Sequence, residues 1–302
     1  MRLIDHLKSL GLGNRAARDH LESGKIWLRG VPVADAAREV DPADVRVRPD
    51  APRVRMGRDP VVIWRDDDIA VLFKPSGLLS VPAPGREDEP NVLAEIGRRF
   101  GSVYAVHRLD EETSGLMLLA FRPESQQALK SLIEDHEVER RYLALVLGDF
   151  KRDGTHASVL LRDRGDGRRG SAPGREWHGA WTESPPALPI PAGGGKLAVT
   201  RVRRVEGCGR ACLVEAWLET GRTHQVRIHL AELGHPVLGD GLYGPVHTRR
   251  DRRGGRLALH AWRLAFTHPF TRAPLSFEAP LADDLEQRRR ELRGETPRRD
   301  QA

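Results

Sequence analysis

A polar stretch at residues 107–116 lies between two short apolar runs, at 103–106 and 116–121. Each run has the length of a strand rather than of a helix. The pattern therefore predicts a strand, a polar turn closed by Ser114 and Gly115, and a second strand. Such a turn would hold the carboxylate of Asp110 on rigid structure, where a reactive group is well placed. The same residues are also typical of an ordinary acidic turn, so this stretch alone does not define a function.

The composition indicates a soluble globular protein. The chain has 302 residues, of which 39% are hydrophobic and 30% charged, enough for one large and one small domain. No apolar stretch approaches the ~20 residues that span a bilayer, and an early acid, Asp5, argues against a signal peptide. We therefore expect a cytoplasmic monomer that does not associate with membranes. Cys208 and Cys212 have no second pair of ligands nearby, so we expect reduced, packed thiols and no metal site.

The chain is basic, with 49 Lys and Arg against 43 Asp and Glu and a pI of about 9.7. Five arginines gather at residues 248–256, where Asp251 is the single acid. They are Arg249, Arg250, Arg252, Arg253 and Arg256. Guanidinium groups pair with phosphate through two hydrogen bonds, so this segment suits a polyanion. A solvated loop explains it equally well.

Residues 1–49 are expected to form a small domain of their own. Its expected order is helix, helix, strand, hairpin strand and strand, at 3–10, 15–21, 26–28, 31–33 and 44–47, with Asn14 capping the second helix. This order resembles the αL RNA-binding domain of the ribosomal-protein-S-four-like type. The resemblance implies that Arg15, Arg18 and Lys25, around the second helix, bind RNA.

A proline-rich linker at 50–60 is expected to lead into a second domain at 61–282. Helices are expected at 91–100, 126–133 and 223–233, and strands at 69–73, 141–147, 196–205 and 211–218. Residues 149–195 are rich in Gly, Pro and charge, which indicates an insertion, either a lid or a tolerated surface loop. Residues 283–302 hold six arginines and six acids and are expected to form a charged, frayed helical tail.

Four segments of this second domain share one order with a known family. They are 64–85, 107–116, 140–148 and 221–229, supported by 234–236, 239–244, 257–261, 268–269 and 279–280. In this order they resemble the RluA-type pseudouridine synthases, some of which also carry the leading RNA-binding domain. The resemblance implies an α+β fold in which a large mixed, mostly antiparallel sheet carries the catalytic cleft.

The resemblance also implies roles for single residues. Asp110 would be the catalytic aspartate, Tyr142 would lie against the target uracil, and Arg222 would pair with the aspartate. Arg108 would fill the stack that the flipped nucleotide leaves. Isomerising uridine breaks and remakes one bond between ribose and base without loss of electrons, so we expect no cofactor. A carboxylate in a tight pocket keeps its charge when a guanidinium faces it, which is the task assigned to Arg222.

Two other functions fit parts of the pattern. One is an RNA-binding ribosome assembly factor without catalysis, which the joint presence of Asp110, Tyr142 and Arg222 disfavours. The other is a base-removing glycosidase, which usually needs a second carboxylate that we do not find. The chain departs from the family at Arg140, where a lysine is common, at Trp64, and in the long 149–195 segment. The leading RNA-binding domain favours ribosomal RNA over transfer RNA as the partner.

Overall fold

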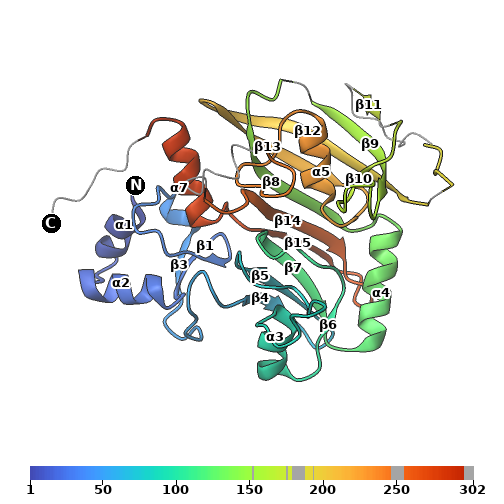
Figure 1. Ribbon diagram of the computed structural model, residues 1–302. Helices are drawn as coiled ribbons and strands as arrows, with labels where there is room; N and C mark the ends of the chain where they lie inside the picture. Colours follow the sequence, from blue (N-terminus) through green and yellow to red (C-terminus); the bar gives the residue numbers. More distant parts are fainter. Residues whose placement is uncertain (152, 175, 179–187, 193, 246–254, 296–302) are drawn as a thin grey trace. The chain divides into compact units, whose positions relative to one another are not determined.

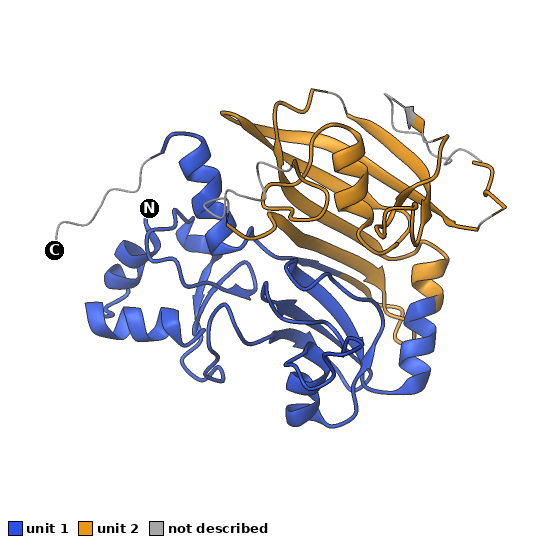
Figure 2. Cartoon of the chain, viewed as in Figure 1, with its two compact units in different colours: residues 1–130, 276–302 blue, residues 131–275 orange. Residues whose placement is uncertain are grey.

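The computed structural model describes the chain from 1 to 302 except for 152, 175, 179–187, 193, 246–254 and 296–302 (Figure 1). Most of the expected arginine-rich segment, at 248–254, therefore lies outside the described residues. The chain forms two compact units: residues 1–130 with 276–302, and residues 131–275 (Figure 2). We call them unit 1 and unit 2. None of the helices in the described ranges is long and apolar enough to span a membrane.

Unit 1 begins with two helices and a three-stranded antiparallel sheet. The elements are α1 (Leu3–Ser9), α2 (Asn14–Glu22), β1 (Ile26–Leu28), β2 (Val31–Pro32), the 3-10 helix η1 (Pro42–Asp44) and β3 (Val45–Val47), with β1 between β2 and β3. Buried Leu3, Leu7 and Leu21 pack together with β1. The order of elements is as expected. Asn14 lies inside α2, however, and Gly13 is the N-cap residue without a side-chain cap.

The segment expected to be a linker is packed against this part of unit 1. Val54 is buried and contacts Trp27 and Val61. It also lies so close to Gly24 that a Cβ at Gly24 would be 2.3 Å from its Cγ2. Residues 50–60 therefore include a packed contact, since an apolar side chain here has a surface to cover.

The C-terminal helix α7 (Asp283–Leu292) is anchored rather than frayed. The carboxylate of Asp283 accepts hydrogen bonds from the backbone N–H of Ala34 (2.7 Å) and from Arg38 Nη1 (2.7 Å). Arg290 pairs with Asp35. The expectation of a frayed helical tail is thus wrong for these residues, because specific ion pairs fix a helix whose composition alone looks solvated.

The rest of unit 1 holds a short antiparallel sheet. Its strands are β4 (Val61–Arg65), β5 (Ile69–Lys74), β6 (Tyr104–Ala105) and β7 (Ser114–Ala120), and β7 pairs with both β5 and β6. Every residue of β7 is buried. Helix α3 (Val92–Phe100) starts where the Asn91 side chain accepts a hydrogen bond from Ala94 N–H. Helix α4 (Pro123–Glu134) follows β7. These elements match the expected strands and helices to within a few residues.

Unit 2 is built on one antiparallel sheet with the strand order β10-β9-β12-β13-β8-β14 (Figure 1). The strands are β8 (Glu139–Leu147), β9 (Gly154–Leu161), β10 (Gly170–Ser171), β11 (Glu176–His178), β12 (Lys196–Cys208), β13 (Ala211–Leu218) and β14 (Leu259–Thr267). Strand β15 (Pro274–Glu278) crosses the boundary between the units in the sequence. Helix α5 (Gln225–Glu232) packs on the sheet through Ile228, which contacts Leu160 and Ala198. The expected α+β class with a large, mostly antiparallel sheet is confirmed.

One segment of unit 2 differs from the expectation. Residues 149–195 were expected to be an insertion, but residues 154–161 form β9, which is almost entirely buried. Strand β9 pairs with β12 from Gly154 to Leu160. Its first five residues are small or polar and its last three are apolar, so the strand carries no hydrophobic pattern that would separate it from the surrounding glycines and charges.

Candidate active site

Asp110 lies in the turn between β6 and β7, as the polar stretch predicts. Its side chain is half-buried, and that of Arg108 is exposed. The carbonyl of Asp110 accepts a hydrogen bond from Thr113 N–H at 3.0 Å, which closes the turn. His107 accepts a hydrogen bond from Leu118 N–H through Nε2 at 3.0 Å and ties the start of the turn to β7. Asp110 is therefore held by backbone geometry.

The end of β5 and the loop that follows it hold this turn through hydrogen bonds. Ser80 Oγ donates to the carbonyl of Leu109 (2.7 Å) and accepts from its N–H (3.0 Å). Lys74 is fully buried, and its Nζ donates to the carbonyls of Glu111 (2.9 Å), Leu78 (2.7 Å) and Pro75 (2.9 Å). Gly77 N–H also donates to the carbonyl of Glu111 at 2.8 Å. Residues 74–80, which we call the clamp loop, thus fix the backbone on both sides of Asp110.

The acid that follows Asp110 is engaged elsewhere. Arg86 donates to both carboxylate oxygens of Glu111, at 2.8 and 3.0 Å. This hydrogen bonding holds the pKa of Glu111 below its ordinary value, although burial acts in the opposite direction. Glu111 is therefore ionised and paired, and Asp110 is the better candidate for chemistry in this turn.

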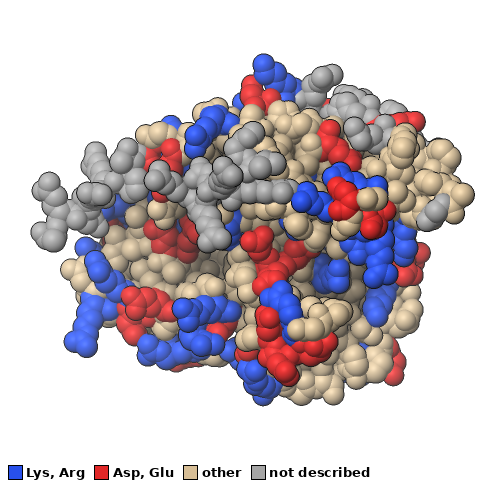
Figure 3. Space-filling view, in the orientation of Figure 1, with Lys and Arg blue, Asp and Glu red and all other residues tan. Residues whose placement is uncertain are grey.

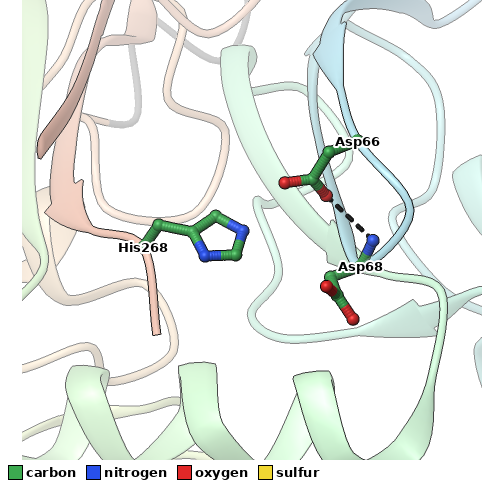
Figure 4. Close-up of side chains that lie close together, drawn as sticks. All are labelled: Asp66, Asp68 and His268. Atoms are coloured by element: carbon green, nitrogen blue, oxygen red, sulfur yellow. Dashed lines mark hydrogen bonds between the residues drawn. The ribbon is translucent and has the colours of Figure 1, made fainter. Parts of the chain in front are cut away.

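Two further acids of unit 1, Asp66 and Asp68, form the turn between β4 and β5. Asp66 Oδ1 accepts hydrogen bonds from the N–H groups of Asp68 and Ile69, both at 2.8 Å (Figure 4). Asp68 accepts a hydrogen bond from Ser125 Oγ at 3.0 Å and lies 3.3 Å from Arg122 Nη2. Short acidic side chains that bond the backbone two residues on are typical of turns, so we assign both to local structure.

Tyr142 belongs to unit 2 and lies in the middle of β8. It is buried, and its partners on the two neighbouring strands are Ala216 in β13 and Ala261 in β14. Small residues on both sides leave the tyrosine ring flanked by little bulk. Arg140 is on the same face of β8, because side chains two positions apart in a strand point the same way.

Arg222 lies in the loop between β13 and α5, also in unit 2. Its side chain is exposed, and its Nε donates to the carbonyl of Leu197 at 3.0 Å. Its backbone N–H donates to Gln225 Oε1 at 2.9 Å. Gln225 also accepts from Thr220 Oγ1 (2.8 Å) and donates to the carbonyl of Val199 (2.9 Å). This buried amide shapes the loop that carries Arg222.

Gln225 and the clamp loop residues Lys74 and Ser80 were not predicted as site residues. The signal for Gln225 is a polar residue inside a run of buried positions, 225–230. Lys74 and Ser80 have no comparable signal, because the contacts that tie them to the turn of Asp110 join residues 37 and 29 positions apart along the chain.

Helix α5 is fixed beside this loop by polar contacts. Arg227 donates to both carboxylate oxygens of Asp240, at 2.8 and 2.9 Å, and the two side chains are almost fully enclosed. His229 is fully buried between Thr200 (2.8 Å) and Ser158 (2.9 Å), and burial lowers its pKa well below the ordinary value. His224, the N-cap residue, has a left-handed backbone with φ of 60°. This backbone conformation is uncommon for residues other than glycine, although histidine adopts it more often than most.

The residues predicted to bind RNA at the N-terminus lie on and after α2. Arg15 and Arg18 are exposed and stand three positions apart, so they share one face of the helix. Lys25 is half-buried and donates to the carbonyl of Pro49. On the face shown in Figure 3, blue and red side chains are interspersed rather than separated. Any affinity for RNA there must come from local clusters of arginine.

The predicted site residues thus fall into separate groups. Asp110 and Arg108 share one turn of unit 1, whereas Tyr142 and Arg222 belong to unit 2. Arg15, Arg18 and Lys25 lie in the first fifty residues of unit 1.

Comparison with known proteins identifies the class. A family model described as RNA pseudouridylate synthase matches residues 68–232, a range that includes Asp110, Tyr142 and Arg222. The fold is similar to a solved structure named Human RNA Pseudouridylate Synthase Domain Containing 1, with a TM-score of 0.58 and 23% identity over 81% of this chain and 98% of that one. The chain belongs to the RNA pseudouridylate synthase family.

Individual relatives carry more specific names. A ribosomal large subunit pseudouridine synthase D of Neisseria meningitidis is 34% identical over 80% of this chain. This chain spans 64% of the length of that relative. A dual-specificity RNA pseudouridine synthase RluA of Pasteurella multocida is 34% identical over 73% of this chain and 93% of its own length.

Proposed function

We propose that this protein is an RNA pseudouridine synthase that isomerises a uridine of ribosomal RNA, with Asp110 as the catalytic carboxylate. The observation that carries the proposal is the clamped turn of Asp110 inside the matched family range. A reacting group needs to be held to within a fraction of an ångström, and five hydrogen bonds from the clamp loop to the backbone of residues 109–112 supply that.

The reaction needs only what such a site can supply. The bond from ribose carbon 1′ to base nitrogen 1 breaks, the base turns, and carbon 1′ joins carbon 5. Carbon 5 then loses a proton and nitrogen 1 gains one, so atoms and electrons balance without a cofactor. Asp110 acts on carbon 1′. The Tyr142 ring stacks on the uracil, and its hydroxyl takes part in moving the carbon 5 proton.

In this proposal, basic side chains contact the catalytic carboxylate and the RNA. Arg222 pairs with Asp110. Arg108, which is exposed in the same turn, fills the gap that the flipped nucleotide leaves. Arg15, Arg18 and Lys25 contact the RNA backbone as part of an S-four-like domain.

The proposed target rests on a relative's name. The Neisseria relative is named for the large ribosomal subunit, which supports ribosomal RNA. The Pasteurella relative is named as dual-specific, which supports testing transfer RNA as the second candidate. We propose that the protein acts as a cytoplasmic monomer.

The test is to incubate the protein with unmodified ribosomal and transfer RNA, digest the RNA and separate its nucleosides by chromatography. We expect pseudouridine from ribosomal RNA and a loss of at least ~10³-fold in rate for Asp110→Asn, as for the loss of a nucleophile. Asp135→Asn, at an exposed carboxylate after α4, is the matched control. Undiminished product with Asp110→Asn contradicts the role of Asp110. Absence of product from the unaltered protein, with RNA still bound, indicates an assembly factor.

A further inference from the structure

Arg140 is a buried arginine of unit 2. Its side chain lies in β8 and the residue is 6% exposed. Its Nε is enclosed and has no hydrogen-bond partner. In the part of the chain that the structure describes, no carboxylate pairs with it. Burial lowers the pKa of Arg140, and the opposing influence of Tyr142 does not outweigh it. Arginine stays protonated in proteins even so, and the charge therefore stands alone.

Three half-buried arginines that also have an enclosed Nε behave differently. Arg141, Arg201 and Arg290 also have an Nε without a hydrogen-bond partner. Each of them, however, forms an ion pair, with Glu139, Glu219 and Asp35 respectively. Arg141 is the immediate neighbour of Arg140 and points to the other face of β8. Arg141 is thus neutralised by a carboxylate, whereas Arg140 beside it has no such partner among the described residues.

The surroundings of Arg140 are those of the candidate site. Tyr142 is two positions along on the same face of the strand. Gly221, which precedes Arg222, lies against the guanidinium: a Cβ at this position would be 2.5 Å from Arg140 Nη1. Glycine therefore leaves the space that the guanidinium occupies. Arg222 is near enough for its charge to act on Arg140 unfavourably.

Two guanidinium groups beside each other, one of them enclosed and unpaired, are unfavourable in the free protein. An anion that enters beside them removes this penalty. Guanidinium groups bind phosphate oxygens through two parallel hydrogen bonds, so a phosphodiester is the chemical class that fits best.

We propose that Arg140 is a phosphate-binding residue, which receives one backbone phosphate of the substrate RNA beside Tyr142. This inference rests on the proposed function and names a contact of the same site. This contact positions the nucleotide whose base stacks on Tyr142. Gly221 has no side chain and therefore leaves room for the guanidinium of Arg140.

The first experiment separates a binding role from a structural one. We expect Arg140→Met to unfold at the same or a higher denaturant concentration than the unaltered protein, because it removes an unpaired buried charge. RNA binding should weaken by about 10- to 100-fold, the effect of losing a charged hydrogen-bonded pair. Arg140→Lys should bind with intermediate affinity, and Arg210→Met, at an exposed arginine of the β12–β13 turn, should bind normally. Binding is measured on Asp110→Asn backgrounds, so that it does not depend on turnover.

The second experiment identifies the phosphate. The modified uridine is first mapped in the RNA, and a synthetic RNA that carries it is then made with single neutral methylphosphonate linkages around that position. At one linkage the change should weaken binding to the unaltered Arg140 protein about tenfold or more and leave binding to Arg140→Met unchanged. Gly221→Ala, which displaces the guanidinium, should behave as Arg140→Met does.

Either of two results overturns the inference. One is an Arg140→Met protein that is destabilised yet binds RNA normally, which makes Arg140 structural. The other is an equal loss for both proteins at every neutral linkage, which means that Arg140 meets no phosphate. Failure of the proposed function looks different: the unaltered protein then forms no pseudouridine, whatever the binding data show.

Discussion

At the scale of single residues, several buried polar side chains of the candidate site use all their hydrogen-bonding groups, whereas Arg140 has an enclosed Nε that meets no partner among the described residues. Lys74 is fully buried and donates to three carbonyls, and Gln225 uses both ends of its amide. Because buried polar groups are costly without partners, we assign these residues to the structure that supports the site. Arg140 breaks this rule beside Tyr142.

Tyr142 offers a clean substitution, because phenylalanine keeps the ring between Ala216 and Ala261 and removes only the hydroxyl. We expect Tyr142→Phe to bind RNA within about twofold of the unaltered protein, since stacking is retained. Its single-turnover rate should drop by ~10²–10⁴-fold, as for the loss of a group that moves a proton. Tyr142→Ala should lose RNA affinity as well. A Tyr142→Phe protein that reacts at the unaltered rate would show that the hydroxyl is dispensable.

At the scale of elements, the loops that carry Asp110 and Arg222 are each restrained by another loop or strand. The clamp loop follows β5 and holds the turn before β7, and β5 pairs directly with β7. The loop that carries Arg222 is tied through Gln225 to β12, and α5 beside it is anchored by Arg227 and Asp240. Positioning is therefore a property of paired elements, and it can be weakened without touching a reacting group.

Ser80 tests the clamp loop. Ser80→Ala leaves the Leu109 N–H buried without an acceptor, which should cost about 1–3 kcal/mol of the free energy of unfolding in urea. Because Leu109 precedes Asp110, kcat should also decrease while KM for RNA stays the same. Ser9→Ala, at an exposed serine of α1, is the control and should change stability by less than about 0.5 kcal/mol. An unchanged kcat in a destabilised Ser80→Ala protein would separate the clamp from catalysis.

A substitution of Asp240 tests how α5 is anchored, because the stability that its ion pair with Arg227 contributes depends on pH. Burial alone would raise the pKa of Asp240, but hydrogen bonds from Arg227 and from backbone N–H groups lower it below the ordinary value of 3.8. A carboxyl whose pKa is lower in the folded state stabilises fully above its unfolded pKa, and this stability is lost as the pH falls through the folded pKa. Asp240→Asn should therefore cost about 3–5 kcal/mol at neutral pH, because it leaves Arg227 unpaired.

The difference in unfolding free energy between the unaltered protein and Asp240→Asn should be constant from pH 7 to about pH 5 and shrink below about pH 4. Urea unfolding at several pH values checks this. A difference that persists undiminished at pH 3 would mean that the amide is unfavourable for a reason other than charge.

For the whole molecule, patterns that are local in the sequence were predictable and contacts between distant residues were not. The turn of Asp110, helix α3 with its Asn91 cap, and the β12–β13 pair follow from short periodic stretches. Strand β9 was hidden among glycines and charges, and the anchoring of α7 depends on Asp283 meeting Arg38, 245 residues away. Tertiary contacts of this kind, such as those of Lys74 with Glu111 and of Ser80 with Leu109, have no local signal in the sequence.

The affinity of the protein for RNA should depend strongly on the salt concentration, because RNA is a polyanion. The net charge of +6 is spread widely, so affinity depends on how many phosphates the clustered arginines neutralise. We expect log Kd to rise linearly with log salt between 50 and 200 mM, with a slope of about 0.7–0.9 per phosphate contact. Arg15→Ala with Arg18→Ala should lower that slope by about 1–2, because both side chains are exposed on one face of α2. Arg98→Ala with Arg99→Ala, an equal change of charge on α3, is the control. Equal slopes for the two double variants would mean that α2 makes no special contact with RNA.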